Sequence, residues 1–462
     1  FITLSRSAFI MTKTIDERAS FLKDAAIEAT RGNNHFEEVQ HHTGTLAFKE
    51  DEFHKRDPDD WMHTTARNNY TAAELAIAKR CHGAHIETAI NDITPIGSHY
   101  LLVHFDVPTL PSTHTMKIHG LVKNELTLDL ETLKTKYACE THPVVLECAG
   151  DGRGALHDRL WVHVPWGQDA FGCSEWTGVR LCDILNEASL CDGAKQVVFT
   201  GADRGIQGNE VQYYQRSLSI DDAMLKTVMV AFVMNGTDIP ASQGYPFRLV
   251  VSGWYGMASV KWLTSIEVTD GNWWGYQMES YSFARSHDDK KKVPMREMLP
   301  RSVMVPPGYP DFFSRTRIIE PGLHKVIGKA WAGAIDLKYV EFSSDYGNTW
   351  KECILYPKNG AFGWASWEVL WDATVEGTYI LLSRCVDKMN HEQNTLTDTQ
   401  FNYGSFACTQ PQCIYIKVDQ KISTPGAIID LTPEINAART HDASSVSSTD
   451  PIDALYRVAG HQ

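Results

Sequence analysis

Long apolar runs are missing from this 462-residue sequence. The longest run worth testing as a membrane span, residues 228–234, is far shorter than the ~20 residues that a spanning helix needs. We therefore expect no membrane span.

Positive charge is also scarce, since 43 Lys and Arg residues stand against 57 Asp and Glu residues, for a formal net charge of -14. An acidic surface of this kind repels phosphate backbones, which argues against a nucleic-acid partner. The sequence also lacks a G-x-G-x-x-G turn after a strand and a P-loop, so the usual cradles for nicotinamide and nucleotide phosphates are missing.

Regular cysteine spacing is a third absence. Ten cysteines are scattered irregularly, and no C-x-x-C pair occurs among them. A chain of this size needs no disulfide framework, so most of these residues are expected to be small buried hydrophobic side chains. Without a C-x-x-C-H motif we expect no haem in this chain. The first residues, FITLSRSAFIMTKTIDER, show no convincing secretory pattern, which favours an intracellular location, cytoplasmic or mitochondrial.

Changes in composition and in the pattern of apolar residues along the chain predict its domain organisation. Polar stretches suggest solvated or poorly ordered ends, and short apolar runs broken by Gly suggest packed strands. We expect a polar N-terminal extension at 1–95 with short helices at 20–29 and 72–79, a first folded domain at 96–285, a charged linker at 286–299, an all-strand domain at 300–420 and a flexible tail at 421–462.

The first folded domain is predicted to be α+β. VVLECAG, QVVFTGAD, MVAFVMNG, YPFRLVV and VKWLTSIEV are typical of strands, whereas residues 179–188 (VRLCDILNEA) predict an amphipathic helix. No clean βαβ alternation appears. In the second domain Val340 and Phe342 alternate with Glu341 and Ser343, as half-buried strands require, which favours an immunoglobulin-like sandwich.

The segment LECAGDGR, residues 146–153, is the first candidate for chemistry. A strand delivers Cys148 into a turn with two glycines, and Arg153 follows closely with a fixed positive charge. A thiol in that setting has a reason to ionise, and a thiolate is either a nucleophile or a ligand for a soft metal. A structural buried cysteine remains an alternative, as does a cysteine hydrolase, although no nearby histidine sits in a recognisable signature.

Two segments that could bind an anion follow downstream. TGADRG (200–205) contains Asp203, and SQGYPFRLVVSGWYGMASVKW (242–262) contains Arg248 and Lys261 among glycines and aromatic residues. Arginine and lysine in a glycine-rich backbone form a plausible cradle for a phosphate-bearing ligand. Each residue alone could equally make a surface salt bridge.

These segments together resemble the sulfite oxidase family of molybdopterin enzymes. LECAGDGR, FGCSEWTGVRLCDIL, FTGADRG, FVMNGTDIPASQGYPFRLVVSGWYGMASVKWLTSIEV and VPPGYPDFFSRTR occur in the family's order over residues 98–418, and the haem-free, sulfite-oxidase-like branch is most similar. The resemblance implies a mixed α/β molybdopterin-binding domain, an immunoglobulin-like dimerisation domain and a homodimer. It also implies a molybdenum–molybdopterin cofactor with Cys148 as the protein ligand of the metal.

Further roles carry over from the resemblance residue by residue. Tyr214 matches the active-site tyrosine, with Tyr213 as a neighbouring alternative, and Arg153 matches an arginine of the substrate anion pocket. The implied cofactor-binding residues are His104, Asp203, Arg248, Ser259, Val260 and Lys261.

Three departures weaken the expected sulfite pocket. Leu102-Val103 stands where the family has Arg-Asn, Asp151-Gly152 replaces Asn-Arg, and Gln243 replaces a common histidine. Sulfite is a dianion that a bidentate arginine binds well, so its loss bears on the substrate.

The resemblance implies two-electron oxygen-atom transfer that oxidises sulfite or a related small anionic sulfur compound. The electrons would pass to an external acceptor, which could be a cytochrome, another carrier or oxygen. A sulfoxide or nitrate-type reductase with the same cofactor is the first alternative, and a non-catalytic structural relative is the second.

Overall fold

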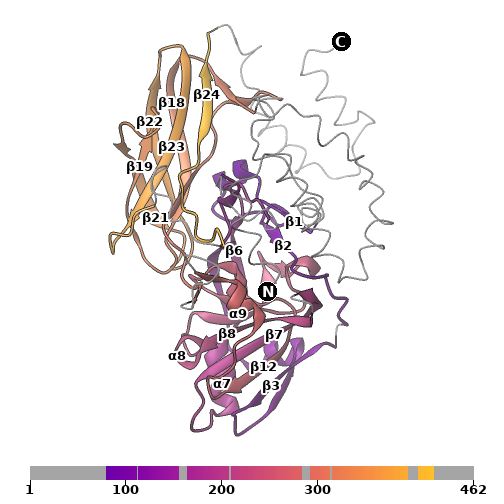
Figure 1. Ribbon diagram of the computed structural model, residues 1–462. Helices are drawn as coiled ribbons and strands as arrows, with labels where there is room; N and C mark the ends of the chain where they lie inside the picture. Colours follow the sequence, from indigo (N-terminus) through magenta and orange to yellow (C-terminus); the bar gives the residue numbers. More distant parts are fainter. Residues whose placement is uncertain are drawn as a thin grey trace, which may run out of the picture. The chain divides into compact units, whose positions relative to one another are not determined.

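The computed structural model describes residues 80–111, 113–155, 164–207, 210–283, 292–312, 315–393 and 404–420. The helices predicted at 20–29 and 72–79, the tail at 421–462 and part of the linker lie outside the described residues. Within them, strands dominate and the α-helices are short (Figure 1). No helix in this part of the chain is both long and apolar enough to cross a membrane.

The region between residues 81 and 283, here called the central region, contains two five-stranded sheets. In one, the order β10-β9-β6-β5 is extended by β11 on β9; in the other, the order is β4-β3-β12-β7-β8. A short pair, β1 with β2, precedes them. The strands are β1 (Cys81–His82), β2 (Leu101–Leu102), β3 (Thr115–Gly120), β4 (Leu126–Asp129), β5 (Cys139–Glu147), β6 (Phe171–Arg180), β7 (Gln196–Gln207), β8 (Glu210–Ser219), β9 (Val228–Met234), β10 (Thr237–Asp238), β11 (Arg248–Val251), β12 (Leu263–Thr269) and β13 (Ser282–Phe283).

Short helices connect these strands. Helix α6 begins where the Asp129 carboxylate accepts a hydrogen bond from the Thr132 backbone N–H at 2.8 Å, an N-cap that satisfies one free donor of the first turn. The described helices are α6 (Leu130–Lys136), α7 (Leu181–Ala188), α8 (Ile220–Ala223) and α9 (Tyr276–Ser280), with 3-10 turns η2 (Ile86–Ile90), η3 (Arg153–Ala155), η4 (Ala241–Gln243) and η5 (Gly256–Ala258).

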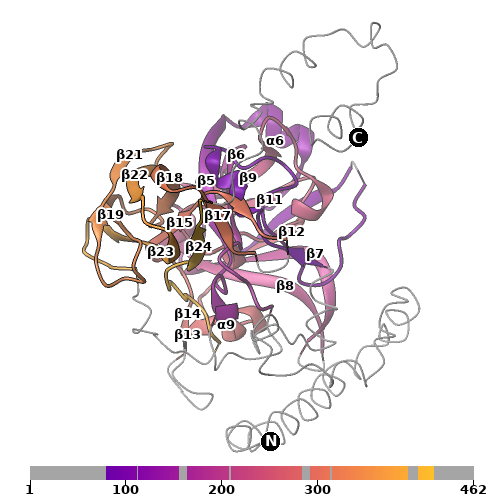
Figure 2. The same cartoon turned by 90° about the horizontal axis from the view of Figure 1, so that it is seen from above.

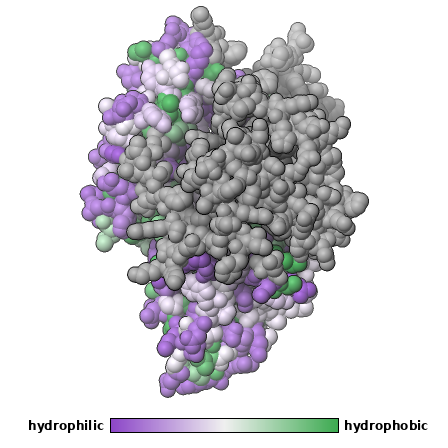
Figure 3. All heavy atoms as spheres, viewed as in Figure 1, coloured by the Kyte–Doolittle hydropathy of each residue, from purple (hydrophilic) through white to green (hydrophobic). Residues whose placement is uncertain are grey.

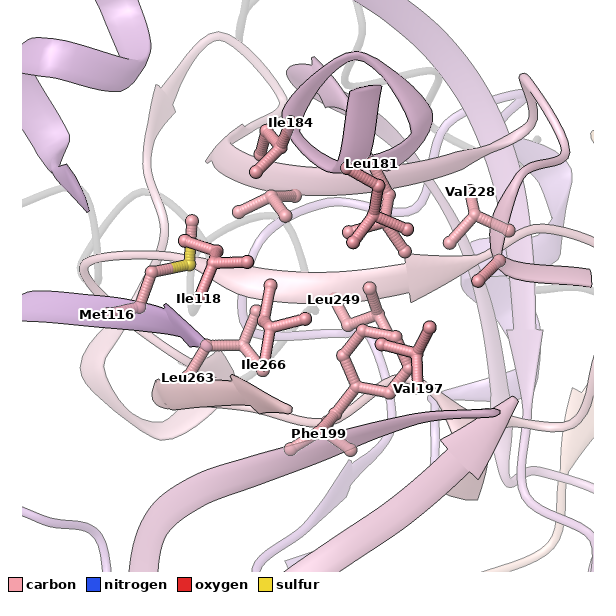
Figure 4. Packing of buried hydrophobic residues seen from close by; sticks show 14 of the residues in the cluster. Met116, Ile118, Leu181, Ile184, Val197, Phe199, Val228, Leu249, Leu263 and Ile266 are labelled. Carbon is pink, nitrogen blue, oxygen red and sulfur yellow. The ribbon is translucent and has the colours of Figure 1, made fainter. Parts of the chain in front are cut away.

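One apolar core joins the two five-stranded sheets. Met116 and Ile118 on β3 and Phe199 on β7 lie in the same cluster as Leu249 on β11 and Leu181 on α7 (Figure 4). Each of these side chains is fully buried. Burial of this kind stabilises the region by about 1.5–3 kcal/mol for each large apolar side chain.

The predicted helix at residues 179–188 is confirmed with a later start. Val179 and Arg180 end strand β6 and pair with Val230 and Met229, so α7 begins only at Leu181. Sheet pairing overrides the helical periodicity for these two residues, since Val179 is fully buried in the sheet. The five strand predictions in this region are confirmed as parts of β5, β7, β9, β11 and β12.

The residues from 293 to 418, here called the C-terminal region, form two further sheets, of four and six strands. Trp367 and Val369 from the first sheet share an apolar cluster with Val340, Leu381 and Ile416 from the second. The long strands run side by side in Figures 1 and 2. The strands are β14 (Val293–Pro294, paired with β13), β15 (Arg301–Met304), β16 (Tyr309–Pro310), β17 (Arg317–Ile319), β18 (Gly322–Trp331), β19 (Leu337–Ser343), β20 (Lys351–Glu352), β21 (Ile354–Lys358), β22 (Ala365–Ala373), β23 (Gly377–Asp387) and β24 (Ile414–Val418).

The described surface is mixed, with hydrophilic residues prominent on the face in Figure 3. That agrees with the excess of acidic residues in the sequence. The predicted alternation in β19 holds for Val340, Glu341 and Phe342, but Ser343 is buried because its hydroxyl accepts from the backbone N–H groups of Asp345 and Gly347.

Candidate active site

A single cavity in the central region brings together most residues that the sequence singled out. Its walls come from segments that are far apart in the chain, between His99 and Tyr281. The predicted residues that line it are His104, Cys148, Asp203, Tyr214, Arg248, Ser259 and Lys261. Two predicted residues, Arg153 and Val260, are not among the described residues that line it.

Cys148 lies directly after β5, in a tight turn. Its backbone N–H donates to the carbonyl oxygen of Ala170 at 2.8 Å, and its own carbonyl accepts from the Asp151 N–H at 2.9 Å. Gly152 has φ +80, a left-handed conformation that glycine adopts without strain, and a Cβ there would lie 2.9 Å from the carbonyl oxygen of Cys408. The turn is therefore fixed by its backbone.

Burial raises the pKa of the Cys148 thiol to about 11, although the nearby Arg153 charge pulls it down. Arg153 and the Gly150 backbone both lower the pKa of this thiol, as the sequence suggested, but desolvation outweighs them while no metal is bound. A bound soft metal ion would stabilise the thiolate, which the arginine alone does not, because a thiol that coordinates a metal is deprotonated.

Arg153 packs behind the turn. It is 4% exposed, and its guanidinium carbon lies 4.9 Å from the centre of the Phe406 ring. A Cβ on Gly150 would collide with this guanidinium, so the glycine lets the arginine fold back against the turn. Val260 is buried, and its carbonyl accepts from the Leu249 N–H at 2.8 Å, so it holds the wall rather than facing the cavity.

Two cationic side chains line the cavity, Arg248 buried and Lys261 partly buried. Arg248 Nη1 donates to the Gln243 carbonyl at 2.9 Å and Nη2 to the Ser259 carbonyl at 3.0 Å. Lys261 Nζ donates to the carbonyl oxygens of Leu102 and Ser242, both at 2.9 Å. Burial lowers the pKa of Arg248 to about 10; burial, followed by the Arg248 charge, lowers that of Lys261 to about 7.

The charge balance of the lining indicates an anionic occupant. Asp203 is the carboxylate among the lining residues, and burial raises its pKa to about 7. Arg248 and Lys261 donate mainly to neutral carbonyl oxygens, so their charges are not fully compensated within the wall. Cations of this kind are stabilised when a ligand brings negative charge.

Two histidines line the same cavity. The Nε2 atom of His99 is buried and has no hydrogen-bond partner among the described residues, and burial lowers the pKa of this imidazole to about 4. The Nε2 of His104 lies 2.8 Å from Gln207 Oε1, and burial lowers its pKa to about 4. Buried polar atoms usually find partners, so the unpaired His99 nitrogen fits a polar ligand in the cavity.

The two candidate tyrosines, Tyr213 and Tyr214, lie in different surroundings. Tyr214 lines the cavity and its hydroxyl donates to the Met257 carbonyl at 2.8 Å, whereas Tyr213 is 44% exposed. Tyr281 also lines the cavity and was missed by sequence reasoning. Burial raises its pKa to about 12, Cys148 adds to the rise, and Arg153 opposes it. Its surroundings, WWGYQMESYSF, offered only aromatic richness as a signal.

Comparisons with known proteins cover the same part of the chain as this cavity. Residues 104–277 match the family described as oxidoreductase molybdopterin binding domain. The chain is 29% identical to sulfite oxidase of Gallus gallus over 295 residues, covering 60% of this chain and 62% of that one. It is 30% identical to nitrate reductase [NAD(P)H] of Hordeum vulgare over 308 residues, covering 60% of this chain and 34% of that one. The chain thus spans less than two thirds of these relatives.

Among solved structures, the sulfane dehydrogenase SoxCD from Paracoccus pantotrophus is similar in fold, with a TM-score of 0.61 and 24% identity, over 72% of this chain and 85% of that chain. The family match indicates a molybdopterin-binding oxidoreductase domain within residues 104–277. This match and the similarity to sulfite oxidases and nitrate reductases imply molybdenum–molybdopterin as the cofactor.

Proposed function

We propose that this protein catalyses two-electron oxygen-atom transfer that oxidises sulfite or a related small sulfur compound. The observation that carries this proposal is the convergence of Cys148, Arg248 and Lys261 on one cavity. When bound, the molybdenum cofactor supplies the redox chemistry, and the protein supplies orientation and electrostatics.

Cys148 is the proposed ligand of the metal, because a thiolate is a preferred partner of soft metal ions. Arg248 and Lys261 would bind the anionic part of the cofactor. Their backbone contacts hold both cations in place before any ligand arrives, which lowers the entropic cost of binding.

The remaining cofactor-binding residues act through polar contacts. His104, oriented by Gln207, and Asp203 offer polar groups to the cavity, while Ser259 and Val260 shape its wall through the backbone. The Ser259 hydroxyl is already engaged, since it accepts from the Val251 N–H at 3.0 Å.

Tyr214 and Arg153 are the proposed catalytic residues. Arg153 is not among the described residues that line the cavity, but its positive charge acts on Cys148, and this charge would favour an anionic substrate there. Tyr281 joins them, because its hydroxyl belongs to the same cavity and its pKa responds to both Cys148 and Arg153. A neutral tyrosine hydroxyl donates a hydrogen bond without adding charge.

Nitrate-type reduction is the second candidate. Leu102 lines the cavity at the position where the resemblance places an arginine, so the positive charge available to a substrate is reduced. A monoanion such as nitrate demands less compensating charge than the sulfite dianion. The similarity to nitrate reductases is as strong as that to sulfite oxidases.

The partners follow from the same proposal. Electrons would pass to an external acceptor, a cytochrome, another carrier or oxygen. We further infer that the two packed sheets of the C-terminal region form an immunoglobulin-like dimerisation domain and that the protein is a homodimer; size-exclusion chromatography with light scattering tests this.

The decisive experiment is metal analysis of purified protein followed by two assays. Molybdenum near one atom per chain with saturable sulfite-dependent ferricyanide reduction supports the first candidate. Saturable nitrate-dependent oxidation of a reduced viologen supports the second. Fully loaded protein that is silent in both assays and whose metal undergoes no redox change would support the non-catalytic alternative.

A further inference from the structure

One arginine from the C-terminal region contacts residues on both sequence flanks of Cys148. Arg301 opens strand β15, lies in a different region from Cys148, and is fully buried. We propose that Arg301 is a positioning residue for the metal ligand, one that couples the C-terminal sheets to the orientation of the Cys148 side chain. This inference rests on the proposed role of Cys148.

The first contact is on the N-terminal flank of the cysteine. Arg301 Nε donates to Glu147 Oε1 at 2.7 Å, and Glu147 Oε2 accepts from Trp331 Nε1 at 2.7 Å. Glu147 is the last residue of β5 and Cys148 follows it directly, so holding the Glu147 carboxylate restrains the backbone from which the Cys148 side chain projects. Glu147 is fully buried, and such a carboxylate depends on its partners.

The second contact is on the C-terminal flank. Arg301 Nη2 donates to the carbonyl oxygen of Asp151 at 3.2 Å, and Arg301 Nε lies 3.3 Å from Asp151 Oδ2. The other carboxylate oxygen of Asp151 accepts from the backbone N–H groups of Asp169 at 3.0 Å and Ala170 at 2.8 Å. One guanidinium thus touches the residue before Cys148 and the residue that closes its turn.

The third contact extends this arrangement to the segment before β24. Arg301 Nη2 donates to the carbonyl of Cys408 at 2.6 Å, and Arg301 Nη1 donates to Gln168 Oε1. The Ala407 N–H in the same segment donates to the Ala149 carbonyl at 2.7 Å. The turn is therefore enclosed between its own strand and the C-terminal region.

The planar guanidinium is what makes this arrangement possible. Its donors lie in a fixed fork that reaches several acceptors at once, whereas a lysine ammonium is a compact point charge. Arg301→Lys therefore keeps the buried charge and removes the fork. Groups that orient a metal ligand through hydrogen bonds commonly change metal affinity by about 10–100-fold when mutated.

The test compares Arg301→Lys with Arg317→Lys in the full-length protein. Arg317 is also buried, also lies in the C-terminal region, and pairs with Glu87, away from the Cys148 turn. We expect both variants to keep the wild-type circular dichroism spectrum. Arg301→Lys should retain about tenfold less molybdenum after dialysis against a chelator. In the metal it retains, the sulfur-to-metal charge-transfer band should shift, whereas Arg317→Lys should match wild type in both measurements.

A second variant covers the case in which Arg301→Lys does not fold. Glu147→Gln keeps the side-chain shape and leaves Arg301 paired with Asp151, and we expect it to shift the same absorption band. Folded variants with wild-type metal retention and an unchanged band would overturn the positioning role. Wild-type protein that binds no molybdenum when the cofactor is supplied would instead overturn the proposed function, so the two failures are distinguishable.

Discussion

Lys261 Nζ lies 2.9 Å from the carbonyl oxygen of Leu102, so this partly buried side chain is held against the backbone of another residue that lines the same cavity. The contact places a positive charge beside the position where the resemblance calls for an arginine. The lysine cannot take over that bidentate role, because its donors point to carbonyl oxygens of the wall.

Replacing Lys261 by Met should therefore weaken cofactor binding without lowering the free energy of unfolding of the cofactor-free protein. Cofactor retention should fall about tenfold or more, since one charge–charge interaction with the anion is lost. The free energy of unfolding of cofactor-free protein should stay equal or rise by about 1–4 kcal/mol, because a desolvated charge is removed. Urea unfolding and molybdenum analysis measure the two effects, and a loss of stability comparable to that of a core deletion would contradict this account.

Cys148→Ser should abolish turnover and molybdenum retention while the circular dichroism spectrum is unchanged. A hydroxyl is a poor ligand for a soft metal at neutral pH, although it has nearly the size of the thiol. Cys173→Ser is the matched control, because Cys173 is fully buried on the neighbouring strand β6 and does not line the cavity. The control should lose some stability yet keep its metal; turnover by Cys148→Ser would remove the ligand assignment.

Gly152→Ala should destabilise the fold more than Gly97→Ala. Both glycines have left-handed φ, +80 and +91, so both substitutions carry the same backbone strain of about 1–2 kcal/mol. Only at Gly152 would the added Cβ meet the Cys408 carbonyl, at 2.9 Å, since nothing lies within 4 Å at Gly97. Thermal unfolding of the two variants gives the contact contribution by difference. Equal losses would mean that the segment around Cys408 adapts freely.

Tyr281→Phe should lower turnover by roughly 10–100-fold, the expected effect of losing one hydrogen bond to a charged group. Tyr213→Phe is the control, because this side chain is 44% exposed and lies outside the cavity. Steady-state kinetics with sulfite or nitrate, whichever the wild-type protein turns over in the assays proposed above, provide the comparison. Equal rates for the two variants would exclude Tyr281 from the reaction.

The pH dependence of stability should carry a signature of His99. Burial lowers its pKa from 6.5 to about 4. Between these two pH values the unfolded state binds a proton that the folded state does not bind. Stability is therefore fully present above pH 6.5 and falls as the pH drops towards 4, by roughly 3 kcal/mol for this one group. His99→Gln in cofactor-free protein should remove that part of the acid-side loss, measured by urea unfolding at pH 7.5 and 4.5. Parallel profiles would contradict it.

The sequence predicted those site residues that stand in ordered motifs. Cys148, Asp203, Arg248 and Lys261 lie in segments whose glycine turns and charges are visible locally, and all four line the cavity. Arg301 could not be found in this way, because its partner Glu147 is 154 residues away and a buried arginine at the start of a strand leaves no local pattern. The pKa of Cys148 could not be predicted from the sequence either, because it depends on how completely the folded protein excludes water from the thiol.

The cavity walls come from segments as distant as His99 and Tyr281, so a ligand bound there would contact parts of the chain that are far apart in sequence. Such a ligand binds only when these segments are in place together, and it therefore stabilises their association. We expect the local opening of these segments to become rarer when the site is filled, which slower amide hydrogen exchange in the cavity walls would report.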